Sequence, residues 1–78
     1  MKRIHLMKRI YLIIRTDAID YDEHDAVVIV AETSKQAEEI AYNGYYGDFK
    51  EGKIICKVIG LADNNQAIGE VLNSFNAG

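Results

Sequence analysis

The sequence predicts an α+β fold in which an antiparallel sheet of three to four strands packs one helix on one face, in the order ββαββ. Short runs rich in β-branched and aromatic residues recur along the chain, and the hydrophobic period changes once to that of a helix. The 78 residues suffice for one domain, but a domain of this size buries only about 60% of the surface that its unfolded chain exposes. We therefore expect modest stability, supported by a well-packed core or by oligomerisation.

Two strands are expected in the first half of the chain. Residues 10–15 read IYLIIR, and the polar residues Thr16 and Asp17 end this run. Residues 26–31 read AVVIVA, which is apolar on both faces of a strand. An acidic loop from Asp17 to Asp25 is expected to join the two strands.

One helix and two more strands are expected after residue 31. Thr33 and Gln36 have the spacing of a capping box, with Ser34 as the competing N-cap. Gly44 supplies the helix end, because glycine tolerates the left-handed conformation found there. The apolar residues at helical spacing are Ala37, Ile40 and Ala41. The segments IICKVIGL (54–61) and EVLNSFNA (70–77) are the remaining strands.

The chain begins with two similar copies of six residues, MKRIHL and MKRIYL. A shift of six leaves each residue of a strand on the same face as its twin, whereas it rotates a helix out of phase. Two explanations stay open: Met7 is the older start, or a long strand reaches beyond the sheet to another chain. We accordingly treat residues 1–6 as an N-terminal extension and residues 7–78 as a single domain.

Two loops carry residues typical of contact surfaces. The acidic loop is open to three interpretations: a solvated connection, a cation site that lacks the usual calcium-loop glycine, or a surface that meets a basic partner. The segment after the helix gathers tyrosines between glycines, a favoured arrangement at interfaces, although Phe49 and one tyrosine are also expected to close the core. The candidate partner-binding residues are Asp20, Tyr21, Asp22, Glu23, Asp25, Tyr45 and Tyr46.

The sheet has apolar side chains on both faces, yet one helix of about ten residues, roughly 15 Å long, covers only one of them. We expect the other face to be covered by a second copy, by the C-terminal segment or by a different protein, with Lys57 and Arg15 as its polar rim. The residues assigned to this oligomer face are Tyr11, Ile13, Ile55 and Ile59.

Catalysis is not expected, because no residue stands in a nucleophile-elbow or Cys-His context and no glycine-rich phosphate cradle occurs. No cofactor and no metal are expected. The net charge of −3 does not favour nucleic acid binding, and the apolar run 10–14 is too short for a signal sequence or a membrane span. Cys56, the single cysteine, is expected to be a small buried hydrophobe in a reducing, cytoplasmic setting.

The segments YLIIRTD, YDEHDAVVIVAET, QAEEIA, EGK and VLNSFNAG resemble small uncharacterised proteins of bacteriophages, over Tyr11 to Gly78. The ending SFNAG is the most specific part of this resemblance. The family carries no assigned activity, so the resemblance implies only a context: an accessory phage protein in the bacterial cytoplasm. The element order is also similar to that of some anti-CRISPR inhibitors, which occupy a surface of a defence complex.

These expectations lead to a functional hypothesis with two alternatives. The chain is expected to be a non-enzymatic phage protein that binds and inhibits a host protein or ribonucleoprotein complex. The alternatives are a structural homo-oligomer with paired sheets and a small-ligand or nucleotide-binding module.

Overall fold

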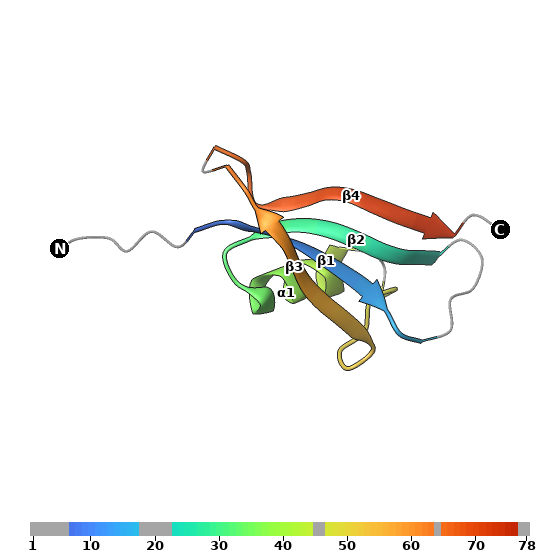
Figure 1. Ribbon diagram of the computed structural model, residues 1–78. Helices are drawn as coiled ribbons and strands as arrows, with labels where there is room; N and C mark the ends of the chain where they lie inside the picture. Colours follow the sequence, from blue (N-terminus) through green and yellow to red (C-terminus); the bar gives the residue numbers. More distant parts are fainter. Residues whose placement is uncertain (1–6, 18–22, 45–46, 64, 77–78) are drawn as a thin grey trace.

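The computed structural model describes residues 7–17, 23–44, 47–63 and 65–76. Four strands and one helix follow one another as β1 (Arg9–Arg15), β2 (Glu23–Ala31), α1 (Ser34–Gly44), β3 (Ile54–Leu61) and β4 (Gly69–Asn76). The α+β class and the predicted order ββαββ are confirmed (Figure 1). The duplicated opening cannot be followed into the structure, because residues 1–6 lie outside the described residues.

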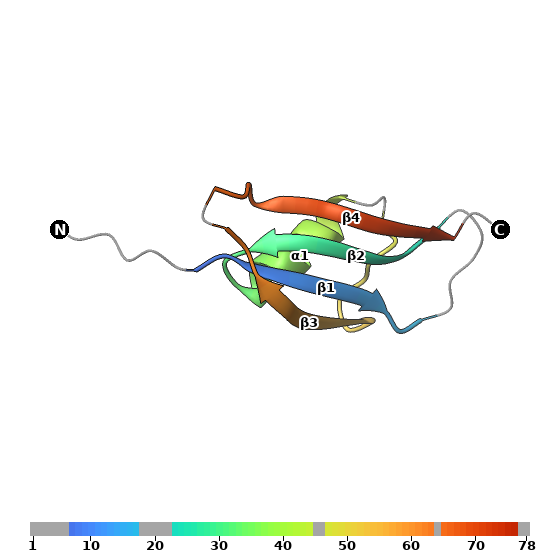
Figure 2. The ribbon, with the colours of Figure 1, turned by 45° about the horizontal axis from the view of Figure 1, so that its top comes forward.

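The strands form one antiparallel sheet in the order β3-β1-β2-β4. The first strand of the chain is therefore central, while β3 and β4 are the two edges. Figure 2 shows the sheet from the side on which β1 and β2 lie in front and α1 lies behind them. The C-terminal strand extends the sheet at its edge, so it does not fold over either face as one of our expectations allowed.

β2 begins earlier than the sequence predicts. Glu23 and His24 pair with Asn76 and Phe75 of β4, so the strand takes in residues that were expected to belong to the acidic loop. The ladder between these strands is irregular after His24, where the register shifts. The connection between β1 and β2 is consequently shorter than expected.

The predicted capping box starts the helix. The Oγ1 atom of Thr33 accepts a hydrogen bond from the backbone N–H of Gln36 at 3.1 Å, so Thr33 is the N-cap and Ser34 is the first helical residue. In return, Oε1 of Gln36 accepts a hydrogen bond from the backbone N–H of Glu32 at 2.8 Å. The first bond satisfies a donor of the helix N-terminus, whereas the second reaches Glu32, one residue before the N-cap, so the reciprocal half of the predicted capping box is displaced by one position.

The core lies between α1 and one face of the sheet. Tyr11 and Ile13 of β1 are buried there beside Val27 and Ile29 of β2. Phe49, on the connection from α1 to β3, is 2% exposed and closes the core as expected. The small helix residues that allow α1 to approach the sheet are Ala37 and Ala41, and both are fully buried.

Candidate interaction surfaces

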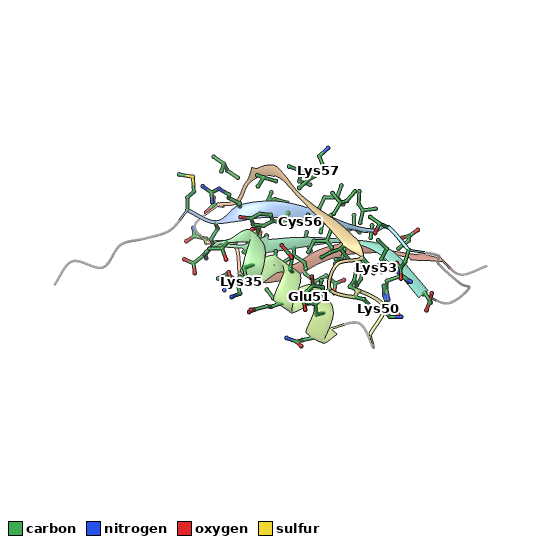
Figure 3. The ribbon with its side chains drawn as sticks, turned by 90° about the horizontal axis from the view of Figure 1, so that it is seen from below. Lys35, Lys50, Glu51, Lys53, Cys56 and Lys57 are labelled. Carbon is green, nitrogen blue, oxygen red and sulfur yellow. The ribbon has the colours of Figure 1, made fainter. Side chains whose placement is uncertain are left out.

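The face of the sheet turned away from α1, called the open face here, carries apolar side chains across all four strands. The pairing registers place its residues in three rows, which are Gly60–Ile10–Val30–Gly69, Lys57–Leu12–Val28–Leu72 and Ile55–Ile14–Ala26–Ser74. Ile14, Ile55 and Leu72 are 37%, 50% and 64% exposed, and Ile10, Leu12 and Val28 are half-buried. Across these rows Lys57 is the one charged residue, and Figure 3 shows it on the side of the sheet opposite the helix.

The oligomer-face assignment is half wrong. Tyr11 and Ile13 are 2% and 0% exposed beneath the helix, so they belong to the core and not to the uncovered face. Ile55 does lie on the open face, where it pairs with Ile14 rather than with Ile13. Ile59 is 52% exposed and lies where the ladder between β1 and β3 is irregular. The uncovered face of β1 therefore carries Ile10, Leu12 and Ile14.

A buried arginine holds the polar end of the sheet, called the loop end here, where β1 ends and β2 begins. The Arg15 side chain is 3% exposed, and its Nε and Nη2 donate to the two carboxylate oxygens of Asp17 at 2.9 and 3.0 Å. Its Nη1 donates to Oε1 of Glu23 at 3.2 Å and to the backbone carbonyl of His24 at 3.1 Å. Arg15 thus lies on the helix side, and its expected place on the rim of the open face is wrong.

The ion pairs of Arg15 shift the pKa values of their members. The hydrogen bond to Asp17 raises the pKa of Arg15, and the hydrogen bond to Glu23 adds to this effect against the opposing effect of burial. The same contact lowers the pKa of Asp17. Because Asp17 and Glu23 stand on either side of residues 18–22, one fixed cation ties together both flanks of the acidic loop.

The loop end is extended by a second pair, His24 and Asp48. Oδ2 of Asp48 accepts hydrogen bonds from the backbone N–H of His24 at 2.8 Å and contacts its ring Nδ1 at 2.9 Å. Burial raises the pKa of Asp48, but the hydrogen bonds from His24 outweigh it, so the pKa is lowered. Within the described residues, Oδ1 of Asp25 is buried without a hydrogen-bond partner. Three carboxylates, those of Asp17, Glu23 and Asp48, therefore contact one arginine and one histidine.

The structure tests the candidate partner-binding residues only in part. Glu23 and Asp25 are half-buried at the loop end, and Glu23 is held there by Arg15. The other candidates lie outside the described residues, and these are Asp20, Tyr21, Asp22, Tyr45 and Tyr46. Asp48 and Phe49 are adjacent in sequence. The connection from α1 to β3 therefore supplies one residue to the loop end and the next residue to the core.

A cavity of about 220 Å³ lies beside the exposed side of α1. It is lined by Lys35, Glu38, Glu39, Tyr42 and Glu51. The Tyr42 hydroxyl donates to Oε1 of Glu38 at 3.3 Å, and burial together with the charge of Glu38 raises the pKa of Tyr42. Figure 3 places Lys35 and Glu51 on the helix side of the molecule. Three carboxylates around one lysine repel phosphate, so the charge of this cavity disfavours a nucleotide.

Cys56 lies on the core side of β3, opposite Ile13, and is partly buried. Burial, followed by the charge of Glu38, raises the pKa of its thiol, which lowers the thiolate population at neutral pH. Over the described ranges, no group of three or more His, Cys, Asp or Glu side chains is arranged to hold a metal ion. The single described helix, α1, is too short and too polar to cross a membrane.

Sequence reasoning placed Arg15 on the wrong surface and missed Asp48 and Leu72. A signal existed for Arg15, because it ends an apolar run and is followed two residues later by an aspartate. No local signal pairs Asp48 with His24, since the contact joins positions 24 residues apart. Leu72 gains its place from the register between β2 and β4, which no single strand encodes.

Comparison with protein-family models, with curated proteins and with solved structures finds no match for this chain. The functional argument therefore depends on the open face and the loop end.

Proposed function

We propose that this chain is a non-enzymatic binding protein, which acts by covering part of the surface of another protein. The observation that carries the proposal is the open face, where Ile14, Ile55 and Leu72 remain exposed within an otherwise apolar layer. Contiguous apolar patches larger than a few hundred Å² are rare on monomers and mark sites of association. An exposed apolar face lowers solubility, and it does not help to form the core, which lies on the other face beneath the helix.

The loop end supports a second contact of opposite character. Asp17, Glu23 and Asp48 outnumber the single arginine at this end and leave it with an excess of carboxylates. A basic partner would meet complementary charge here, which increases both the association rate and the specificity. Because Arg15 fixes the flanks of the acidic loop, less conformational entropy is lost when this end binds.

The partner that we propose is a host protein or ribonucleoprotein complex in the bacterial cytoplasm, which the chain inhibits as a phage accessory protein. This part of the proposal is supported by the resemblance over Tyr11 to Gly78 and by the acidic loop end, which suits a basic groove that otherwise holds nucleic acid. The raised pKa of Cys56 disfavours a nucleophilic role for its thiol.

Affinity capture with four tagged baits tests the proposal. The baits are the wild-type chain, Leu72→Lys for the open face, Asp22→Lys for the acidic loop, and Val58→Lys as the matched control. Val58 is 55% exposed on β3 and pairs with Tyr11, so it lies on the opposite side of the sheet from Leu72. We expect a defined host complex in the wild-type and Val58→Lys eluates and its loss with Asp22→Lys or Leu72→Lys. Identical eluates from all four baits would overturn the proposal.

A further inference from the structure

We propose that the open face is covered by a second copy of this chain, so that the protein is a homodimer of two sheets packed face to face. This inference rests on the proposed role of the open face as a binding surface. The second copy occupies that face and the host partner contacts the paired loop ends, so Leu72→Lys would weaken host capture by separating the two copies. The argument uses the area of the face, the matching of its rows under a two-fold axis and the size of the chain.

The area of the open face is sufficient for a specific dimer. Four strands spaced about 4.8 Å apart span about 19 Å, and strands of about eight residues at about 3.4 Å per residue are about 27 Å long. Each copy therefore contributes a flat footprint of about 500 Å², and the two copies together bury at least about 1,000 Å². That total is near the lower bound for a biological interface, the size range in which weak and transient complexes lie.

A two-fold axis parallel to the strands makes the face complementary to itself. This axis places β3 over β4 and β1 over β2 of the second copy, and it keeps each row opposite the same row. Leu12 then lies over Val28 of the second copy, and Ile14 lies over Ala26 of the second copy, so that a large side chain meets a small one. Sheets that pack face to face keep their strands within about 30° of alignment, which preserves these contacts near the axis.

The position of Lys57 selects this axis over the alternative. A two-fold axis perpendicular to the strands places β3 over β3, which brings Lys57 directly opposite Lys57 of the second copy. Two ammonium groups facing each other in a desolvated interface are strongly unfavourable. With the axis parallel to the strands, Lys57 instead meets Leu72 of the second copy at the edge of the sheet, where its alkyl chain packs and its charge reaches water.

The size of the chain favours the second copy as the occupant. A 78-residue domain without a disulfide or a structural metal among its described residues builds its core against one face of the sheet only. Small domains of this kind commonly gain stability by oligomerisation. The proposed axis also leaves both loop ends at the same end of the dimer, because it does not reverse the strand direction. The dimer would therefore present two acidic surfaces side by side to one partner.

Size-exclusion chromatography with light scattering, from 1 to 200 µM, tests the inference on the full chain. We expect the wild-type mass to rise with concentration toward twice the 8.8 kDa of one chain. Leu72→Lys, which places a charge opposite Lys57 of the second copy, is expected to weaken dimerisation at least tenfold, and Leu72→Glu less than Leu72→Lys. Val58→Lys is the control and is expected to dimerise as the wild type does. Far-UV circular dichroism verifies that each variant is folded, and Ile55→Lys replaces Leu72→Lys if the latter does not fold.

The outcomes separate this inference from the proposed function. A wild-type chain that stays monomeric at 200 µM overturns the dimer, as does a dimer that Leu72→Lys and Val58→Lys weaken equally. Equal effects of Leu72→Lys and Leu72→Glu overturn the proposed axis. A monomer whose capture of a host complex depends on Leu72 leaves the proposed function standing while the dimer fails. A dimer that depends on Leu72 but captures nothing leaves the dimer standing while host binding fails.

Discussion

Two neighbouring isoleucines on the central strand offer a direct test of which face of the sheet is the core. Ile13 is fully buried beneath α1, whereas Ile14 is 37% exposed on the open face. Replacing either by alanine removes the same three carbons from the same strand, so backbone and propensity effects nearly cancel in the comparison. The difference between Ile13→Ala and Ile14→Ala then reports the environment of the two side chains.

The expected magnitudes follow from burial. Three buried carbons at about 0.8 kcal/mol each give about 2.4 kcal/mol for Ile13, and the cavity left behind raises the cost to about 3–4 kcal/mol. Ile14 loses only the buried part of its transfer free energy, about 1.5 kcal/mol, because water fills the space on the open side. The variants should therefore differ by about 2 kcal/mol in free energy of unfolding.

Urea unfolding followed by circular dichroism at 1 µM measures this difference, which corresponds to roughly 2 M in midpoint at a slope of about 1 kcal/mol per M. At 100 µM the proposed dimer would add a contact from the second copy to Ile14, so the cost of Ile14→Ala should increase while the cost of Ile13→Ala stays constant. Equal costs for the two variants at 1 µM would refute the assignment of the odd-numbered residues of β1 to the core.

Three further predictions concern the loop end, the helix start and the cysteine. Arg15→Met should lower the free energy of unfolding by about 2 kcal/mol at pH 7, since the buried cation is removed but its carboxylate partners can reach water. Because the pKa of Asp17 is lower in the folded state than its ordinary value of 3.8, its ionised form stabilises the fold above that pH. This stabilisation is lost as the pH falls through the folded-state pKa. The difference in melting temperature between the wild type and Arg15→Met should therefore become smaller below that pH. A difference that does not change with pH would contradict the ion pair. Thr33→Ala should cost about 1 kcal/mol in urea unfolding, whereas Thr33→Ser should be nearly neutral, because only the hydroxyl caps Gln36. Cys56 should react with a thiol reagent more slowly than the same cysteine in the urea-unfolded chain, and equal rates at neutral pH would argue against its raised pKa.

The sequence predicted the elements well because each leaves a local pattern. The apolar runs at 10–15 and 54–61 match β1 and β3 closely, and Thr33 with Gln36 marks the helix start that the structure shows. The faces were harder to predict. The alternation of a strand predicts that Tyr11 and Ile13 share one side of β1. It does not predict which side the helix covers, since both sides are apolar.

The pairing register between strands was the second feature that could not be predicted from the sequence. Within β3, Ile55 and Ile59 lie four positions apart and would share one face of a regular strand, but the irregularity opposite Ile10 breaks the alternation between them. Across strands, Ile55 pairs with Ile14 and Gly60 pairs with Ile10, so the open face combines even positions of β1 with odd positions of β3 before the irregularity and an even one after it. Such pairings depend on hydrogen bonds between distant segments, and a single sequence carries no direct record of them.

The central place of β1 has a consequence for the way the chain folds as it is made. Of the four strands, β1 is synthesised first, but one of its two neighbours, β3, is synthesised only after the helix. β4, which pairs with the other side of β2, is synthesised last. A nascent chain that ends before residue 54 lacks a neighbour for that edge of β1 and so exposes a template for wrong pairing. The complete native sheet therefore cannot form until β3 and β4 have been synthesised.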